Sequence, residues 1–424
     1  MREYQSVINR RNLIGAGSAV LLAATASSAK PAPNALPASP DDHDFWHAVG
    51  AQYDVTREVV QLENGQWCMM PLPVLKAYQH YSQTVNWRNT FYTRRGYDGD
   101  VEKVRAHAAR DLGVSVDEIA FTRGATESLM ALINGYNRLR PGDAVLYADL
   151  DYDSTQAAFR WLKTHRGVDV VSINLPEPAT HQNLIDAYDA ALAANPHVRL
   201  MLLTHVSHRT GLALPAAEII ALARSRGVDV IVDSAHAWGQ LDFKISDLKA
   251  DFVAFTCQKW MGAPVGTGIV YIKRDRLGDI DDAIGEVESA SVDIRQKVHS
   301  GTSNFAGFLA LGDALDFHEK IGAHAKQARL RHLRDRWAEE LRGQVEILTP
   351  SDPRLTSGVT SFRLRGKNSE ADNLALADTL LRRFNIFTVE RSGVASGSCI
   401  RVTVALYTTE AEVDQLVKAL KTLA

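Results

Sequence analysis

The sequence is poor in cysteine and carries no excess of charge of either sign. Three cysteines, Cys68, Cys257 and Cys399, are spread over 424 residues, and this odd, widely spaced set fits neither a disulfide framework nor a metal cluster. The 47 basic and 50 acidic residues nearly cancel, and no basic stripe is found, which argues against a nucleic-acid partner. The length leaves room for two domains and a sizeable core.

The first 40 residues read as an export segment that precedes the fold. Arg10 and Arg11 stand ahead of a mildly apolar run at residues 13–26, and the small residues that follow offer cleavage sites. The run is too short and too rich in glycine and alanine for a membrane anchor. Asn9 departs from the usual motif, and a chance arginine pair is the alternative. We predict a twin-arginine signal peptide at residues 1–29 and a periplasmic protein that is exported already folded.

An acidic and a basic side chain follow two apolar runs. Residues 228–232 form a buried strand that delivers Asp233 at its carboxyl end, and residues 251–256 deliver Lys259 just beyond theirs. Because ligands of parallel sheets bind outside the carboxyl ends of the strands, both side chains are expected in one crevice. A carboxylate keeps a pyridine nitrogen protonated, and a desolvated amine becomes a Schiff-base nucleophile. The pair predicts a pyridoxal 5'-phosphate site; a solvated loop lysine is the alternative.

Residues 228–273 resemble the class V aminotransferase family, which includes cysteine desulfurases, kynureninases and isopenicillin N epimerases. The chain is most similar to the isopenicillin-N-epimerase-like branch. The resemblance implies an α/β protein of the pyridoxal-phosphate-dependent transferase fold type I, with a large domain built on a mostly parallel, seven-stranded sheet and a small α+β C-terminal domain. It also implies that Lys259 forms the Schiff base, that Asp233 pairs with the pyridinium nitrogen and that His236 contacts the phenolic oxygen or the ring edge.

A glycine turn that enters a helix predicts an anion site. Residues 123–126 read as the turn and residues 127–139 as an amphipathic helix, whose N-terminal N–H groups favour a phosphate. Many turns of this kind contain glycine and threonine, so the signal alone is weak. In register with Lys259 it resembles the phosphate cup of the family, with Ala125 and Thr126 as donors.

Five further side chains are assigned to the cofactor by the resemblance. Thr256 and Gln258 would bind the phosphate; the family usually has histidine in place of Gln258, but an amide can also donate. Tyr152 occupies the position of the ring that stacks on the cofactor, with an ordinary loop tyrosine as the alternative. His208 stands where desulfurases carry an asparagine that contacts the phenolic oxygen, or is a structural histidine. Thr302 would reach the phosphate of the neighbouring subunit of a homodimer.

The C-terminal region resembles the substrate-binding part of the family. Arg401, on the last expected strand, maps to the guanidinium that clamps the substrate α-carboxylate in a bidentate grip. Desulfurases carry a nucleophilic cysteine on the loop shortly before this arginine. Here residues 391–398 contain no cysteine and Cys399 falls inside the following strand, so a desulfurase is rejected as the main interpretation.

The order of the motifs predicts the domain organisation. Residues 30–97 form a linker and an N-terminal arm, residues 98–300 the large cofactor-binding domain, and residues 301–424 the small domain. From residue 101 onward helices and strands alternate, as in a parallel α/β sheet. The arm contains an aromatic and cationic stretch at residues 86–97, which suits either a substrate carboxylate or a subunit interface.

These features predict an exported, homodimeric, pyridoxal-phosphate-dependent enzyme that acts on an amino acid or on an amino-acid-containing peptide or siderophore. The export signal makes the chain similar to a periplasmic pyridoxal-phosphate enzyme of pyoverdine maturation. We expect an amino transfer, with epimerisation or lyase chemistry of the same family as the alternative. A cofactor-binding protein without turnover is a further alternative, and the joint presence of Lys259, Asp233 and Arg401 argues against it.

Overall fold

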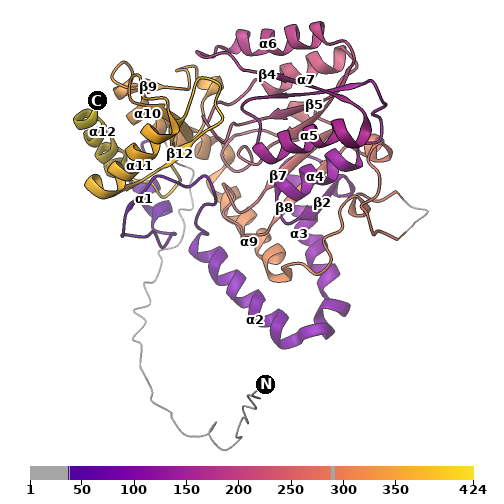
Figure 1. Ribbon diagram of the computed structural model, residues 1–424. Coiled ribbons are helices and arrows are strands. Elements are labelled where there is room, and N and C mark those ends of the chain that lie inside the picture. The colour runs from indigo at the N-terminus through magenta and orange to yellow at the C-terminus, as the bar shows by residue number, and fades with distance from the viewer. Residues whose placement is uncertain (1–36, 38, 288–291) are drawn as a thin grey trace, which may run out of the picture.

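The computed structural model describes residue 37 and residues 39–287 and 292–424 (Figure 1). The predicted signal peptide lies outside these residues. Within the described part of the chain, no helix is both long enough and apolar enough to cross a lipid bilayer. The described chain folds around a seven-stranded and a four-stranded β-sheet, and a further two-stranded sheet lies in the N-terminal arm region.

A seven-stranded sheet forms the larger part of the molecule. Its strands follow the order β2-β8-β7-β6-β5-β3-β4, in which β8 runs antiparallel to both neighbours and the other pairs are parallel. The strands are β2 (Ile119–Thr122), β3 (Ala144–Ala148), β4 (Asp169–Ile173), β5 (Val198–Thr204), β6 (Asp229–Asp233), β7 (Phe252–Thr256) and β8 (Gly268–Ile272). The mostly parallel sheet predicted for a fold type I transferase is confirmed.

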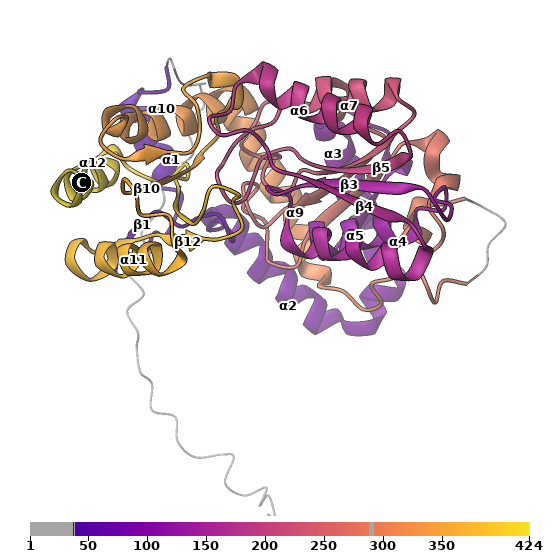
Figure 2. The same cartoon turned by 45° about the horizontal axis from the view of Figure 1, so that its top comes forward.

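Helices cover both faces of this sheet (Figure 2), because alternate residues of a strand point to opposite sides. The helices are α3 (Tyr97–Leu112), α4 (Ala125–Gly135), α5 (Asp153–Arg166), α6 (His181–Ala194), α7 (Ala216–Ser225), α8 (Ile245–Leu248) and α9 (Phe305–Ile321). Leu200 and Leu202 of β5 belong to the apolar cluster that contains α4 and α5, whereas Met201 and Leu203 belong to the cluster that contains α6 and α7. Burial on both faces explains why this strand reads as a continuous apolar run.

A smaller, four-stranded antiparallel sheet is formed by the C-terminal part of the chain, in the order β12-β13-β10-β9. Its strands are β9 (Glu346–Ile347), β10 (Val359–Arg363), β12 (Val389–Arg391) and β13 (Cys399–Thr403), and its helices are α10 (Ala323–Leu341), α11 (Glu370–Phe384) and α12 (Glu410–Leu423). It lies beside the larger sheet in both views (Figures 1 and 2). The domain limits predicted at residues 98 and 301 stay predictions.

The N-terminal arm is fixed to this smaller sheet. Strand β1 (Val60–Gln61) pairs in parallel with β11 (Ile386–Phe387), and Glu63 forms a bridge with Thr403 of β13. The backbone N–H of Thr403 donates to the carbonyl of Leu62 at 2.8 Å. The arm is therefore held in register with the last strand of the chain, more than 300 residues away in sequence.

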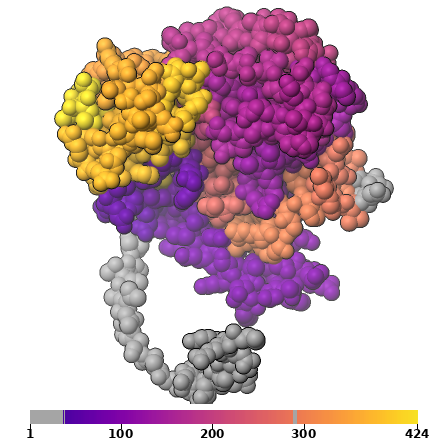
Figure 3. Space-filling model, in the orientation of Figure 1, coloured from indigo at the N-terminus to yellow at the C-terminus, as the bar shows by residue number. Residues whose placement is uncertain are grey.

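The arm also contains α1 (His43–Gly50) and the 24-residue α2 (Leu72–Arg95), which has Pro71 as its N-cap and a kink at Asn89, where φ is 48°. Helix α2 packs along α9, and its far part projects from the body of the molecule (Figures 1 and 3). Trp87 and Phe91 on α2 are 84% and 68% exposed. No residue of the stretch 86–97 lines the cavity described below, so a carboxylate-binding role for it finds no support. The interface alternative stays a prediction.

Helices α9 and α10 are separate because Gly322 adopts a φ of 85° and ends α9 before α10 begins. The charged stretch at residues 274–300 contains short 3-10 helices at Arg274–Asp279 and Ile294–Lys297. A side-chain cap from Asp293, which accepts from the N–H of Arg295, stabilises the second of these.

Gly211 joins the two sheets at very close range. It follows β5 with a φ of 79°, and a Cβ atom at this position would lie 1.9 Å from the carbonyl oxygen of Val359 in β10. The carbonyl of Gly211 also accepts a hydrogen bond of 2.9 Å from the hydroxyl of Ser357. Glycine is required here both by the left-handed backbone and by the approach of the neighbouring strand.

We expect Gly211→Ala to lower the free energy of unfolding by at least about 2 kcal/mol, because backbone strain and overlap with β10 add together. Gly227→Ala is the matched control: Gly227 also has a positive φ, of 70°, but no atom lies within 4 Å of its would-be Cβ. Gly227→Ala should lower the free energy of unfolding by only about 1 kcal/mol. Equal losses for the two variants in urea unfolding would show that the approach of β10 carries no energetic weight.

Candidate active site

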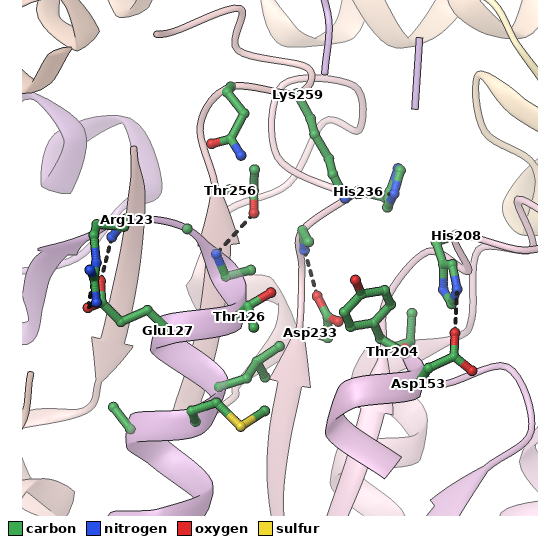
Figure 4. A pocket seen from close by; sticks show the side chains of 18 of the residues that line it. Arg123, Thr126, Glu127, Asp153, Thr204, His208, Asp233, His236, Thr256 and Lys259 are labelled. Atoms are coloured by element: carbon green, nitrogen blue, oxygen red, sulfur yellow. Dashed lines mark hydrogen bonds and ion pairs between the residues drawn. The ribbon is translucent and has the colours of Figure 1, made fainter. Parts of the chain in front are cut away.

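A cavity of about 1200 Å³ opens at the carboxyl ends of the parallel strands. Its walls come from the ends of β5, β6 and β7, from the first turn of α4 and from β12 and β13 of the smaller sheet. All predicted site residues except Thr302 line it; they are Ala125, Thr126, Tyr152, His208, Asp233, His236, Thr256, Gln258, Lys259 and Arg401. Figure 4 shows six of them, Thr126, His208, Asp233, His236, Thr256 and Lys259, around one space.

Lys259 projects into the cavity three residues beyond the end of β7. Its Nζ atom lies 2.9 Å from Nε2 of His236. Removal of water by the cavity walls lowers the pKa of its ammonium to about 8; the charge of Asp233 opposes this shift, and that of Arg401 adds to it. Near neutral pH, the uncharged form of the Lys259 amine is therefore more populated than in a solvated lysine, and an uncharged amine is a nucleophile.

Asp233 is the last residue of β6, which pairs directly with β7. Its carboxylate is buried and accepts a hydrogen bond of 2.9 Å from the N–H of Ala235. Burial raises the pKa of this carboxyl group, whereas the hydrogen bond and the charge of Lys259 lower it. No cationic side chain of the described residues lies within ion-pair distance of it. A protonated ring nitrogen would supply the missing positive charge.

His236 is held as the neutral imidazole beside Lys259. Burial, followed by the charges of Lys259 and Arg401, keeps its pKa well below the ordinary value. The indole N–H of Trp260 donates to Nδ1 of His236 at 3.4 Å, so the ring proton belongs on Nε2. The Nε2–H group then faces Nζ of Lys259 and donates to it when the amine is uncharged.

The first turn of α4 forms the predicted anion-binding end of the cavity. Ala125 begins the helix, and its N–H donates to Oγ1 of Thr256 at 3.0 Å (Figure 4). Thr126 is exposed to the cavity at the next position, where the N-terminus of the helix favours negative charge. The N–H of Ala125 is thus engaged by Thr256, and the hydroxyl of Thr126 and the amide nitrogen of Gln258 are the side-chain donors that this end of the cavity offers a phosphate.

Tyr152 and His208 lie against each other on the opposite wall. Their ring centroids are 5.1 Å apart in an edge-to-face arrangement, with an angle of 82° between the planes. Burial, with the charges of Arg209 and Arg401, keeps the pKa of His208 well below its ordinary value. His208 is therefore neutral, and both rings line the cavity. The predicted stacking of Tyr152 and the predicted contact of His208 with the cofactor oxygen stay predictions.

Arg401 reaches the cavity from the middle of β13, but its guanidinium already has a carboxylate partner. Nε of Arg401 donates to Oε2 of Glu63 at 3.2 Å, Nη2 donates to Oε1 of the same side chain, and Nη1 donates to the carbonyl of His208 at 2.7 Å. Arg391 of β12 lies on the other side, with its Nη2 atom 3.8 Å from Oε1 of Glu63. Neither Glu63 nor Arg391 was predicted from the sequence to belong to the site.

Thr302 does not line the cavity of its own chain. It is exposed on the segment that leads into α9, whose first turn is capped by Asn304. The side chain of Asn304 accepts from the N–H of Gly307 at 3.0 Å. The predicted role of Thr302 needs a second subunit, and it stays a prediction.

The residues of the cavity fit pyridoxal phosphate. The group combines a carbonyl that condenses with an amine, a basic ring nitrogen and a phosphate, and the cavity offers Lys259, Asp233 and the α4 terminus at separate places. Two buried polar atoms on its wall, Oγ1 of Thr204 and Oε1 of Gln258, have no partner among the described residues. Unpaired buried polar atoms in a lined cavity indicate a missing polar ligand.

Comparison with known proteins supports the assignment of the cavity to pyridoxal phosphate. The family model described as aminotransferase class-V matches residues 67–416. The chain is 30% identical to the isopenicillin N epimerase of Streptomyces clavuligerus over 343 residues, which cover 76% of this chain and 84% of that protein. It is also 30% identical to the isopenicillin N epimerase of Amycolatopsis lactamdurans, with coverages of 89% and 98%.

Solved structures share the fold. The apo cysteine desulfurase of Thermococcus onnurineus superposes with a TM-score of 0.77 at 22% identity, over 89% of this chain and 97% of that one. A C-DES mutant with glycine covalently linked to its pyridoxal phosphate cofactor superposes with a TM-score of 0.74 at 22% identity, over 87% and 98%. At these identities the two structures bear on the fold alone.

The family match spans most of the chain, and the relatives are matched over most of their own length. Together with the placement of Lys259 and Asp233, they establish pyridoxal phosphate as the cofactor. The chain thus belongs to the aminotransferase class-V family and is a pyridoxal-phosphate-dependent enzyme.

Proposed function

We propose that this chain is an exported enzyme that acts on the primary amine of an amino acid, or of an amino-acid-containing peptide or siderophore, and transfers that amino group. The observation that carries the proposal is the partly uncharged Lys259, placed 2.9 Å from His236 and on the strand adjacent to Asp233. A nucleophilic amine beside a buried carboxylate is what covalent attachment of the cofactor requires.

The residues of the cavity divide the work between them. Pyridoxal phosphate, when bound, supplies an electron sink for the bond that breaks at the α-carbon of the substrate. Asp233 would hold the proton on the ring nitrogen, and the N-terminus of α4, with Thr256 and Gln258, would hold the phosphate. Each role rests on a group that already faces the cavity.

Lys259 is suited to move a proton at the α-carbon, because its pKa of about 8 lies near neutrality. His236 stays neutral and does not compete for that proton. Its Nε2–H group donates to the lone pair of the uncharged amine and holds Nζ in place until the lone pair is needed. The pair therefore combines a titrating group with a fixed, non-titrating neighbour.

Epimerisation is the second candidate reaction, because two relatives at 30% identity are isopenicillin N epimerases. Both reactions need the same lysine and the same carboxylate. Amino transfer consumes an amino acceptor and leaves a carbonyl compound, whereas epimerisation inverts the α-carbon without an acceptor. Incubation of one amino compound with and without pyruvate, followed by chiral analysis of the product, separates them.

Burial of the cysteines argues against desulfurase chemistry. Cys399 is fully buried in β13, and burial raises the pKa of its thiol to about 12. Burial likewise raises the pKa of Cys68 to about 12. A sulfur nucleophile must be a thiolate at the site of reaction, so neither thiol is suited to attack a substrate.

Lys259→Ala should abolish covalent cofactor attachment and activity, since no other amine of the described cavity faces Asp233 in the same way. Attachment to the wild-type chain should accelerate as pH rises through about 8, because the uncharged amine attacks. The readout is the visible absorbance of bound pyridoxal phosphate, together with mass spectrometry of the reduced adduct.

Lys326→Met is the matched control for this test. Lys326 is also buried, its pKa is also lowered to about 8, and its Nζ contacts His318 at 3.2 Å outside the cavity. We expect this variant to keep the cofactor. Reducible cofactor on Lys259→Ala, or its loss from Lys326→Met, would place the attachment elsewhere.

Export through the twin-arginine route should depend on Arg10 and Arg11, which lie outside the described residues. Replacing both with lysine should leave full-length protein in the cytoplasm, because this route reads the arginine pair as an address. The control changes another adjacent arginine pair, the exposed Arg94 and Arg95 of α2, to lysine. Normal periplasmic recovery of the Arg10→Lys, Arg11→Lys variant would remove the route from the proposal.

A homodimer with shared active sites is the remaining part of the proposal, and it rests on the exposure of Thr302 next to α9. Thr302→Ala should weaken cofactor affinity roughly tenfold, the loss of one hydrogen bond to a charged group. At a cofactor concentration too low to load Thr302→Ala, mixing this variant with Lys259→Ala should restore part of the activity, because one site of each heterodimer escapes both changes. Heterodimers as inactive as their parents would assign Thr302 to its own subunit.

A further inference from the structure

The guanidinium that would receive a substrate carboxylate is already engaged. Glu63 takes both Nε and Nη2 of Arg401, and these two N–H groups form the edge that binds carboxylates in a bidentate manner. The third nitrogen, Nη1, donates to the carbonyl of His208. Arg401 is 2% exposed and Glu63 is 7% exposed, so the ion pair is desolvated.

The backbone of the arm lies directly against one side of the Arg401 guanidinium. A Cβ atom at Gly65 would lie 2.5 Å from Nη2 of Arg401. The arm itself is anchored: Asn64 donates to the carbonyl of Thr403 at 2.8 Å and accepts from the hydroxyl of Tyr407 at 2.7 Å. Oε1 of Glu63 also accepts from the N–H of Gln66 at 3.2 Å, and this bond would have to follow a shift of the Glu63 carboxylate.

Arg391 offers Glu63 a second partner. Its Nη2 atom lies 3.8 Å from Oε1 of Glu63, and its Nε atom is buried without a hydrogen-bond partner among the described residues. A carboxylate shift on the order of 1 Å would close that gap to the ~2.8 Å of a charge-assisted bond. An unpaired buried carboxylate is strongly disfavoured, so release of Glu63 from Arg401 requires a second cationic donor such as Arg391.

We propose that Glu63 is a specificity residue. Its carboxylate blocks Arg401 from binding a substrate carboxylate, and it frees Arg401 when it moves to Arg391. With Glu63 on Arg401, the site accepts amines whose neighbouring carbonyl is an amide or is absent. With Glu63 on Arg391, it accepts amines that carry a free α-carboxylate. This inference rests on the proposed function, because it names two substrate classes of the same cavity.

The test measures acetate binding to the holoenzyme by calorimetry, with acetate as the simplest carboxylate. Glu63→Gln should bind acetate about tenfold to a hundredfold more tightly, because the bidentate edge of Arg401 no longer carries a carboxylate. Adding Arg401→Ala to this variant should abolish the gain. That loss would assign the gained affinity to Arg401 rather than to another cation of the cavity.

Arg391→Ala tests the transfer to the second partner. In the wild-type background it should weaken acetate binding about tenfold, because Glu63 then lacks a second cationic partner and stays on Arg401. In the Glu63→Gln background most of that loss should disappear. Glu346→Gln is the matched control: Glu346 pairs with the buried Arg363 at 2.7 Å, away from the cavity, and acetate affinity should not change.

Unchanged or weaker acetate binding by a folded Glu63→Gln variant would overturn the proposal and leave Glu63 as a fixed partner of Arg401. If Arg391→Ala binds acetate as tightly as the wild type, the transfer of Glu63 to Arg391 is overturned. This measurement is sufficient to test the proposal if Glu63→Gln does not fold. Folding is checked by thermal unfolding of each variant. Acetate affinity is independent of turnover, so failure of the proposed reaction would appear in product analysis and not here.

Discussion

The withdrawal of water from Lys259 is the constraint on which the rest of the site depends. An ordinary solvated lysine stays protonated near neutral pH and cannot attack a carbonyl. The cavity walls bring the pKa of Lys259 to about 8, and the charge of Asp233 limits how far it falls. His236 can lie 2.9 Å from Nζ because burial keeps its imidazole neutral. A protonated imidazole in its place would repel the charged form of the amine.

The parallel sheet makes this arrangement electrostatically incomplete without the cofactor. Asp233 and Lys259 follow neighbouring strands, so both meet at one edge, and the buried carboxylate has no ion-pair partner among the described residues. Burial raises the pKa of Asp233, and a positive ring nitrogen would lower it again. Binding of the cofactor therefore satisfies a carboxylate that the fold alone leaves uncompensated.

The parts of the site that were predicted from the sequence are those built from neighbouring strands or single turns. Asp233, Lys259 and the start of α4 each follow a local pattern, and a parallel sheet brings such ends together. The pair of Glu63 and Arg401 could not be predicted, because it depends on how the arm pairs with β13 over 338 residues. A charged residue beside a glycine turn does not reveal its partner. The predicted function of Thr302 needs a second chain, so no contact within one chain tests it.

In the proposed function, chemistry and substrate recognition come from different sheets, and this separation would let one scaffold serve different reactions. Lys259 and Asp233 belong to the large sheet, whereas Arg391 and Arg401 come from the small one. Glu63 neutralises one of those two guanidinium groups, so the substrate end keeps one positive charge. Changes at that end alter which carboxylate, amide or amine is accepted without displacing the lysine. Relatives named as epimerases and as cysteine desulfurases are compatible with such a division. Substrate choice in this chain is then set by where one carboxylate, that of Glu63, is held.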